Sequence, residues 1–139
     1  MVVASGSGIP IGCLVADANI YESKLTEQTV DTIRVPRVAR GRPRTKPKRL
    51  IADRAYDSDK LRADFRGRGI DFITPDIPRR THNLQDKRKL RRYRRRWKIE
   101  RVFAWLDSWK RLAMRWDRSL TTYSGLFHVA IMVIALRRL

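Results

Sequence analysis

The spacing of apolar and polar residues predicts short strands and one helix in the first part of the chain. Apolar runs at residues 1–4 and 9–16 flank Ser5-Gly6-Ser7-Gly8, a glycine-rich turn, and this pattern is typical of a β-hairpin. Residues 23–33 place Leu, Thr, Val and Ile on one side at helical spacing. We therefore expect two paired strands, followed by a helix with Ser23 as its N-cap.

A strand, a helix and a second strand are expected next. The apolar run at residues 50–52 ends at Asp53, and the Asp-Ser-Asp segment at 57–59 offers capping side chains to a following helix. Residues 70–73 alternate apolar and polar before a Thr-Pro pair, which indicates a strand. This order predicts a parallel strand pair joined by a right-handed crossover.

The last part of the chain has helical periodicity. Apolar residues recur at three- and four-residue steps from 87 to 112, which predicts one long amphipathic helix, and a second helix is expected over 121–136. We expect core packing, rather than base stacking, for most of the aromatic residues of the long helix: Tyr93, Trp97, Phe103, Trp105 and Trp109. The apolar stretch at 126–136 is shorter than the ~20 residues of a membrane span, so no membrane partner is expected.

The net charge of the chain indicates a polyanionic partner. The 139 residues contain 32 Lys and Arg against 14 Asp and Glu, a net charge of +18, which predicts salt-sensitive binding to a polyanion. DNA and RNA satisfy this charge equally well. The single cysteine, Cys13, excludes an intramolecular disulfide and suits the cytoplasm, and no leader peptide is expected. The length fits one domain over residues 1–139.

Residues 36–49 are a basic, proline-rich segment. Three prolines remove backbone donors while seven Lys and Arg side chains repel one another, so we expect an extended, exposed loop within the domain. The loop has two equally weighted interpretations: an arm that contacts the DNA backbone, or a solvated linker.

Two acids are the candidate catalytic residues. Asp53 stands at the carboxyl end of a predicted parallel strand, where open sheets present functional groups. Glu100 shares a helix face with Tyr93 and Arg96, so a helix beside the sheet would aim it at Asp53. Carboxylates gathered in this way hold Mg²⁺ for phosphodiester chemistry. The alternative is that Asp53 caps a turn and Glu100 pairs with Arg96 or Arg101.

Cationic and aromatic side chains around Glu100 would bring a phosphate to the acids. We expect this DNA-binding set to comprise Tyr93, Arg94, Arg95, Arg96, Lys98, Arg101 and Lys110.

These residues resemble a known family over nearly the whole chain. Asp53-Arg54-Ala55-Tyr56, followed by Tyr93, Arg96 and Glu100 at their spacing, resembles the C-terminal catalytic part of DDE transposases of bacterial insertion sequences, the IS4/IS5-like group. The resemblance implies an α/β fold with a ribonuclease H-like mixed sheet flanked by helices, N-terminally truncated, with a long C-terminal helical pair. It also implies Mg²⁺ or Mn²⁺ at Asp53 and Glu100, DNA as partner, and a homo-oligomer or an upstream-frame transposase product as a second partner.

The sequence departs from the family pattern at three points. Ser5 stands where the first catalytic Asp is expected, and Asp17 and Glu22, the nearest acids, lie beyond the second strand. Asp107 replaces a lysine often expected seven residues after the glutamate, and no N-terminal DNA-binding region is expected. Serine cannot replace a charged bidentate ligand, so one metal site would be weakened or lost.

Three hypotheses follow. The chain is a transposase catalytic fragment that cleaves and transfers DNA strands, or an inactive DNA-binding remnant or regulator of a full-length transposase, or an unrelated basic RNA-binding protein.

Overall fold

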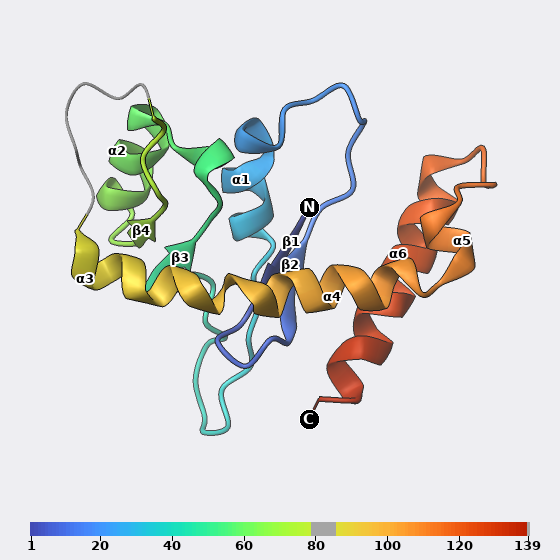
Figure 1. Cartoon of the computed structure of the whole chain (residues 1–139). Helices are drawn as coiled ribbons and strands as arrows, with labels where there is room; N and C mark the ends of the chain where they lie inside the picture. Colours follow the sequence, from blue (N-terminus) through green and yellow to red (C-terminus); the bar gives the residue numbers. More distant parts are fainter. Residues whose placement is uncertain (79–85, 139) are drawn as a thin grey trace.

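The computed structural model describes residues 1–78 and 86–138 as short strands and helices arranged along one long helical rod (Figure 1). In chain order the elements are β1 (Val2–Ala4), β2 (Pro10–Cys13), α1 (Glu22–Asp31), β3 (Arg49–Ile51), the 3₁₀ helix η1 (Arg54–Tyr56), α2 (Asp59–Gly67), β4 (Asp71–Ile73), α3 (Lys87–Leu90), the 3₁₀ helix η2 (Arg91–Arg96), α4 (Trp97–Asp107), α5 (Lys110–Ala113) and α6 (Leu120–Leu136).

The predicted hairpin is confirmed. Strands β1 and β2 pair antiparallel, with Val3 opposite Gly12, and the intervening turn includes Gly8 at φ 84°, a conformation that L side chains rarely adopt. The second strand ends at Cys13 rather than continuing to residue 16 as predicted.

The predicted parallel pair is also confirmed, because β3 and β4 pair in parallel with Leu50 opposite Phe72. Helix α2 connects the two strands. Within the described residues no ladder joins this pair to the hairpin, so the chain has two small sheets in place of the single mixed sheet that was expected. The coarser expectation of a mixed α/β fold is met.

Two hydrophobic clusters lie on either side of the hairpin. Because successive strand residues face opposite ways, Val2 belongs to one cluster while Val3 packs against the other. The first cluster joins α1, α2 and the parallel pair around the fully buried Phe65 and Val30. The second joins α4 and α6 to β1 around Val102 and Ala130. The hairpin therefore contributes side chains to both clusters.

The rod corrects the prediction of one α-helix over 87–112. Segments α3, η2 and α4 follow one another without a break from Lys87 to Asp107, but the middle six residues are 3₁₀ helix. The helix ends at Asp107, because Trp109 is extended and the Ser108 hydroxyl donates to the Trp105 carbonyl at 2.6 Å. Helix α6 begins at Leu120, one residue before its predicted start.

The core-facing stripe of α4 is aliphatic, which corrects the expectation for its aromatic residues. Val102 and Leu106 are buried, whereas Trp97 and Phe103 are exposed and Trp109 lies beyond the helix, also exposed. The aliphatic side chains at three- and four-residue spacing form the buried part of the helix, and Trp105 is half-buried against the same cluster, whereas Trp97 and Phe103 remain in solvent.

One predicted helix cap is wrong, and the other is correct in position but lacks its side-chain bond. Helix α1 begins at Glu22, so Ser23 lies inside it and Tyr21 occupies the N-cap position without a side-chain hydrogen bond. Ser58 is the N-cap residue of α2, but its side chain makes no capping bond, and neighbouring Asp57 contacts Arg62 instead.

None of the helices in residues 1–78 and 86–138 has the length and apolarity needed to cross a membrane.

Candidate active site at the end of strand β3

Asp53 lies two residues beyond β3 and caps the 3₁₀ helix η1. Its Oδ1 accepts hydrogen bonds from the backbone N–H of Arg54 at 2.7 Å and from the Tyr93 hydroxyl at 2.6 Å. Its backbone carbonyl accepts from the Thr74 hydroxyl at 2.8 Å, which ties it to the residue after β4. The carboxylate itself is about half exposed, at 54%. Asp53 is therefore fixed in position while open to a ligand.

The 3₁₀ geometry of η2 explains how two side chains reach Asp53. In a 3₁₀ helix residues three apart lie directly above one another, so Tyr93 and Arg96 project from the same side. Arg96 places Nη1 3.5 Å from Asp53 Oδ2, and its guanidinium lies 5.3 Å from the centre of the Tyr93 ring. The helical register of this segment therefore brings Tyr93 and Arg96, the Tyr–Arg pair of the motif, to Asp53.

Arg96 also connects Asp53 with Glu100. The same Nη1 atom lies 3.2 Å from Glu100 Oε1, one helical turn further along the rod. The structure thus brings together the two predicted acids, which come from different elements, around one guanidinium nitrogen. Both simpler interactions, the Asp53 cap and the Glu100–Arg96 pair, are present as parts of this arrangement.

Hydrogen bonding favours the ionised form of Asp53. The bond from Tyr93, then that from the Arg54 backbone, holds the pKa of Asp53 below its ordinary value, and the positive charge of Arg96 acts in the same direction. Burial, followed by the bond to Asp53, raises the pKa of the Tyr93 hydroxyl. The site at neutral pH is therefore an ionised carboxylate with a protonated phenol as its donor.

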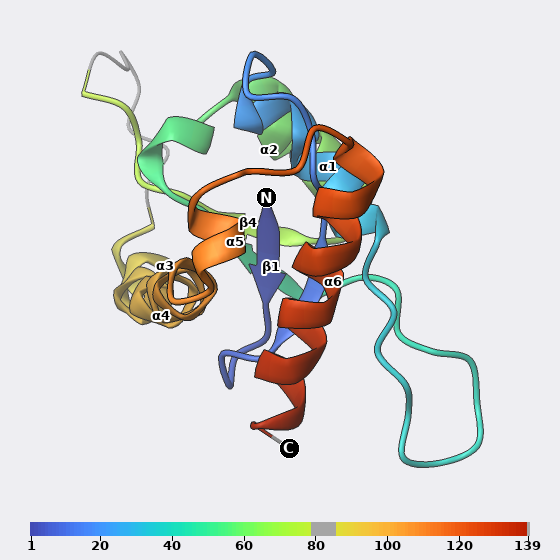
Figure 2. The same cartoon turned by 90° about the vertical axis from the view of Figure 1, so that its right-hand side faces the viewer.

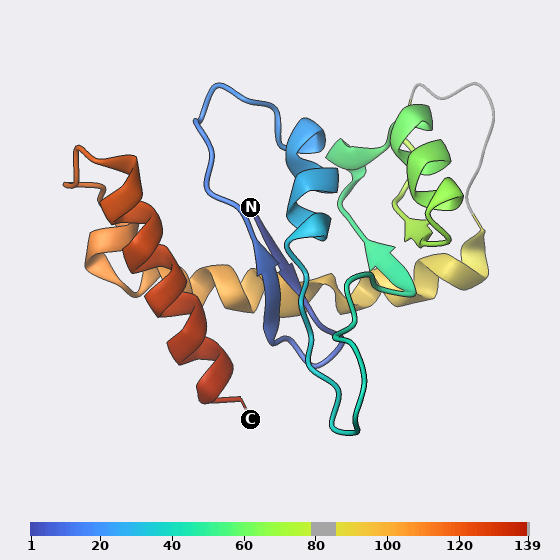
Figure 3. The same cartoon turned by 180° about the vertical axis from the view of Figure 1, so that it is seen from behind.

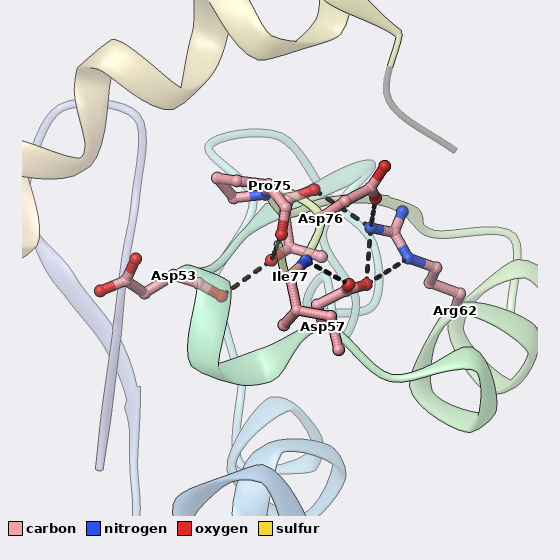
Figure 4. A network of polar contacts seen from close by, with 7 residues as sticks. Asp53, Asp57, Arg62, Pro75, Asp76 and Ile77 are labelled. Atoms are coloured by element: carbon pink, nitrogen blue, oxygen red, sulfur yellow. Dashed lines mark hydrogen bonds and ion pairs between the residues drawn. The ribbon is translucent and has the colours of Figure 1, made fainter. Parts of the chain in front are cut away.

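A largely buried ionic network holds the turn that carries Asp53 (Figure 4). Arg62 of α2 lies 2.8 Å from Asp57 and 2.9 Å from Asp76, and it donates to the Thr74 carbonyl at 3.1 Å. The other oxygen of Asp57 accepts from the Ile77 backbone at 2.9 Å. The network joins the end of η1 to the segment after β4, so it fixes the turn that carries Asp53.

A second support escaped the sequence analysis. The Tyr56 hydroxyl donates to Glu22 at the start of α1, and burial, followed by this bond, raises the pKa of Tyr56 well above its ordinary value. Tyr56 and Asp57 both stand in the motif segment that begins at Asp53. Their place in the motif indicated a functional role, but the partner of Tyr56 lies 34 residues away in sequence and could not be identified from it.

Ser5, in the position expected for the first catalytic Asp, organises the hairpin turn. Its hydroxyl accepts from the Ile9 backbone at 3.1 Å and lies 2.8 Å from the Ser7 hydroxyl. The turn contacts the start of α4, because Lys98 donates to the Gly6 carbonyl. This position therefore lies beside the helix that carries Glu100, although the residue there is neutral.

The remaining predicted DNA-binding residues have different environments. Arg94 and Arg95 are exposed on η2, and Arg101 lies 4.2 Å from the centre of the Trp97 ring. Lys110 is exposed at the start of α5, beyond the end of the rod. Asp107 is exposed at the end of α4. Thus Arg94, Arg95 and Arg101 share the rod with Glu100, while Lys110 belongs to a different segment.

The acids fit one divalent ion, as a partial ligand set. Asp53 and Glu100 offer carboxylate oxygens, the donors that Mg²⁺ and Mn²⁺ prefer. Among residues 1–78 and 86–138 there is no group of three or more His, Cys, Asp or Glu side chains arranged to hold a metal. Asp53 and Glu100 would hold such an ion through their carboxylate oxygens, and it would supply the positive charge needed for phosphodiester chemistry.

Comparison with known proteins identifies the class. Residues 1–135 match the family model described as the transposase DDE domain, and the chain belongs to this family. This membership contradicts the hypothesis of an unrelated RNA-binding protein.

Two curated relatives agree with this assignment. A Burkholderia cepacia protein assigned as the transposase of insertion sequence element IS402 is 32% identical over 117 residues, 84% of this chain and 52% of the relative. A Brucella ovis protein assigned as the transposase of element IS6501 is 34% identical over 88 residues, 63% of this chain and 67% of the relative. The chain thus spans about half to two thirds of these relatives. No solved structure matches it.

Proposed function

We propose that this chain is the catalytic-domain part of a DNA transposase of the IS4/IS5-like group, acting in cut-and-paste transposition through metal-dependent phosphodiester cleavage and strand transfer. One observation carries the proposal: Arg96 holds Asp53 and Glu100, the two acids of the family motif, around a single nitrogen atom. The order of hairpin, parallel pair and acid-bearing helix supports a ribonuclease H-like arrangement over the whole of residues 1–139.

Asp53 and Glu100 are the proposed ligands of Mg²⁺ or Mn²⁺. When bound, such an ion would activate water or a 3′ hydroxyl and neutralise charge on the phosphate. Tyr93 orients Asp53 and favours its ionised form through its hydrogen bond. Arg96, once its carboxylate partners are shared with an ion, would be positioned to contact a phosphate oxygen. The exposed Arg94 and Arg95, which lie between Tyr93 and Arg96 on η2, would contact the DNA backbone.

The test is nicking of a duplex that carries inverted-repeat element ends. Purified chain should nick this DNA only with Mg²⁺ or Mn²⁺, and Glu100→Gln should abolish nicking while leaving DNA binding intact, because the substitution removes one ligand charge and keeps the shape. Wild-type chain that binds DNA in a salt-sensitive way but never nicks it would contradict the catalytic proposal.

A second function, a noncatalytic DNA binder or a regulator of a full-length transposase, is favoured by Ser5. This hydroxyl is engaged in the hairpin turn and carries no charge for a metal. For such a protein, Asp53→Ala and Glu100→Ala would leave DNA binding unchanged, and loss of binding in both variants would count against it.

Ser5→Asp distinguishes the two functions. Aspartate keeps an oxygen that can accept the turn's backbone bonds and adds a carboxylate beside α4. Mn²⁺ affinity, measured by calorimetry, should rise by about tenfold or more if this position faces the metal. A gain in nicking by Ser5→Asp over an inactive wild type would identify the natural chain as a binder with an incomplete site. Unchanged Mn²⁺ affinity would show that Ser5 lies outside the site.

A further inference from the structure

We propose that residues 36–44, the tip of the basic proline-rich loop, form an arm that enters the minor groove of A·T-rich duplex DNA. The proposal rests on the proposed function in one respect, because it takes DNA as the partner. It goes further by assigning a second binding site, away from the acids, and a base-composition preference.

The arm is closed at its base. Val35 and Arg44 exchange two backbone hydrogen bonds, at 2.9 and 2.8 Å, and Lys46 donates to the Arg68 carbonyl at 3.0 Å. These contacts anchor both ends of the segment between α1 and β3. In Figures 2 and 3 the segment projects from the body of the molecule as an open loop. A closed base presents the tip in a restricted orientation, which lowers the entropy cost of binding.

Beyond the Val35–Arg44 pair at its base, the arm lies in solvent. Every residue from Pro36 to Lys46 is exposed, and Val38 is completely so. Within the described part of the chain, no ion pair involves Arg37, Arg40 or Arg42, and no acid occurs between Asp31 and Asp53. The tip is therefore a concentrated positive charge held away from the acids of the protein.

Backbone shape favours the minor groove. Gly41 lies between Arg40 and Arg42 with φ 147°, in the region that favours glycine, and it adds no side-chain width to the chain. Pro43 then restricts the backbone to an extended form. A slender Arg-Gly-Arg segment can enter a groove ≈ 6 Å wide, where an α-helix cannot.

The positive charge of the arm favours A·T-rich DNA. A·T tracts have a narrow minor groove whose negative potential attracts arginine side chains, and G·C pairs place the guanine 2-amino group in that groove. The minor groove of A-form RNA is wide and shallow, so it would not enclose the arm. We therefore expect A·T-rich duplex DNA to be the preferred partner.

Three DNA duplexes of equal length test the assignment: A·T-rich, G·C-rich, and one with inosine in place of guanine. Inosine lacks the 2-amino group, so an inosine·cytosine pair resembles A·T in the minor groove while keeping the major-groove pattern of G·C. Full-length chain should bind the A·T-rich and inosine duplexes about tenfold more tightly than the G·C duplex in fluorescence anisotropy. Equal binding to all three, or inosine binding at the G·C level, would overturn the proposal.

Variants locate the preference in the arm. Arg40→Gln with Arg42→Gln should abolish the A·T preference and lower the slope of log affinity against log salt by about 1.8, because two phosphate-region charges are lost. Gly41→Ala keeps every charge, so it should weaken the preference without changing that slope. A preference that survives the double substitution would sink the proposal.

Two controls separate the possible failures. Arg118→Gln with Arg137→Gln removes two exposed charges from the segment around α6 and should leave the A·T preference intact. Absence of DNA binding by the wild type would contradict the proposed function itself, whereas binding without base preference would contradict only the arm. Tighter binding to an RNA duplex of matched sequence would assign the arm to RNA instead.

Discussion

The role of Arg96 depends on whether a metal ion occupies the site. In the structure its guanidinium neutralises both Asp53 and Glu100, which keeps two acids stable in close proximity. Tyr93 orients one of these acids by hydrogen bonding and needs no charge to do so. At the residue scale, therefore, the site consists of two ionised acids, one phenol donor and one displaceable cation.

Tyr93→Phe should move the pKa of Asp53 back up towards its ordinary value, because the Tyr93 bond is the main cause of the lowering. The lowered pKa means that ionised Asp53 stabilises the fold above the ordinary carboxyl pKa and that this contribution is lost as pH falls through the lowered value. The variant should lose part of this contribution, and the loss should be small since Asp53 is about half exposed. Carboxyl ¹³C NMR titration measures the shift, and Tyr123→Phe, distant from Asp53 in sequence and bonded to Leu112, should leave it unchanged.

At the scale of elements, α1 packs closely on the hairpin through a glycine. A Cβ at Gly12 would lie 2.9 Å from both Ile33 Cγ1 and Thr32 Oγ1, and 3.2 Å from the Thr29 carbonyl oxygen. Thr32 also accepts the Cys13 backbone N–H at 3.0 Å, so the helix cannot move away without breaking that bond. The close contact between the end of α1 and β2 therefore requires glycine at position 12.

Gly12→Ala should lower the free energy of unfolding by about 1–3 kcal/mol, because the added methyl group separates α1 from β2. Gly125→Ala is the matched control: it lies in helix α6 with nothing within 4 Å of the added Cβ, and it should stabilise by up to about 1 kcal/mol. Urea denaturation measures both. Equal effects of the two substitutions would contradict the close packing.

The ionic network below η1 belongs to the same scale. The Asp57 side chain has 0% exposure and Arg62 15%, so removing Asp57 leaves a largely buried guanidinium with one carboxylate fewer. Asp57→Ala should cost about 3 kcal/mol of unfolding free energy and should also weaken Mn²⁺ binding, because Asp53 loses its support. Asp64→Ala removes an acid from an exposed pair with Lys60 and should change stability far less. An unchanged urea midpoint for Asp57→Ala would rule out the supporting role.

At the scale of the whole molecule, the charge of +18 is distributed over several elements, including the loop before β3 and η2. The net field should draw the chain to any duplex and make its affinity fall steeply with salt. The two regions should differ in what they recognise, because we expect η2 to contact the DNA backbone beside the acids and the loop to contact the minor groove.

Arg94→Gln with Arg95→Gln should lower the salt slope of DNA binding by about 1.8 and leave the A·T preference unchanged, because both side chains are exposed on η2 and away from the loop. Arg94→Lys with Arg95→Lys keeps the charge and should keep the slope. Affinity titrations at a series of salt concentrations give the slopes. If the variant with Arg94→Gln and Arg95→Gln lost the A·T preference, η2 and the loop would not have separate roles in DNA binding.

Several features could be predicted from the sequence because they depend on neighbours along the chain. The turn at Ser5 to Gly8, the apolar run before Asp53 and the apolar periodicity of α6 each specify a local element, and all three elements form. Net charge is a sum over residues, so it requires no fold. The spacing of Tyr93, Arg96 and Glu100 likewise follows from helix geometry, which is local.

Only the tertiary structure decided which distant groups meet. The 3₁₀ winding of η2 aligned Tyr93 with Arg96, and packing of the rod beside β3 brought both to Asp53. The partners of Tyr56 and Arg62, the two separate sheets and the aliphatic seam of α4 also depend on packing between segments. Such contacts are selected by the burial and hydrogen bonding of the whole chain, so periodicity along the sequence predicts the elements but not the contacts between them.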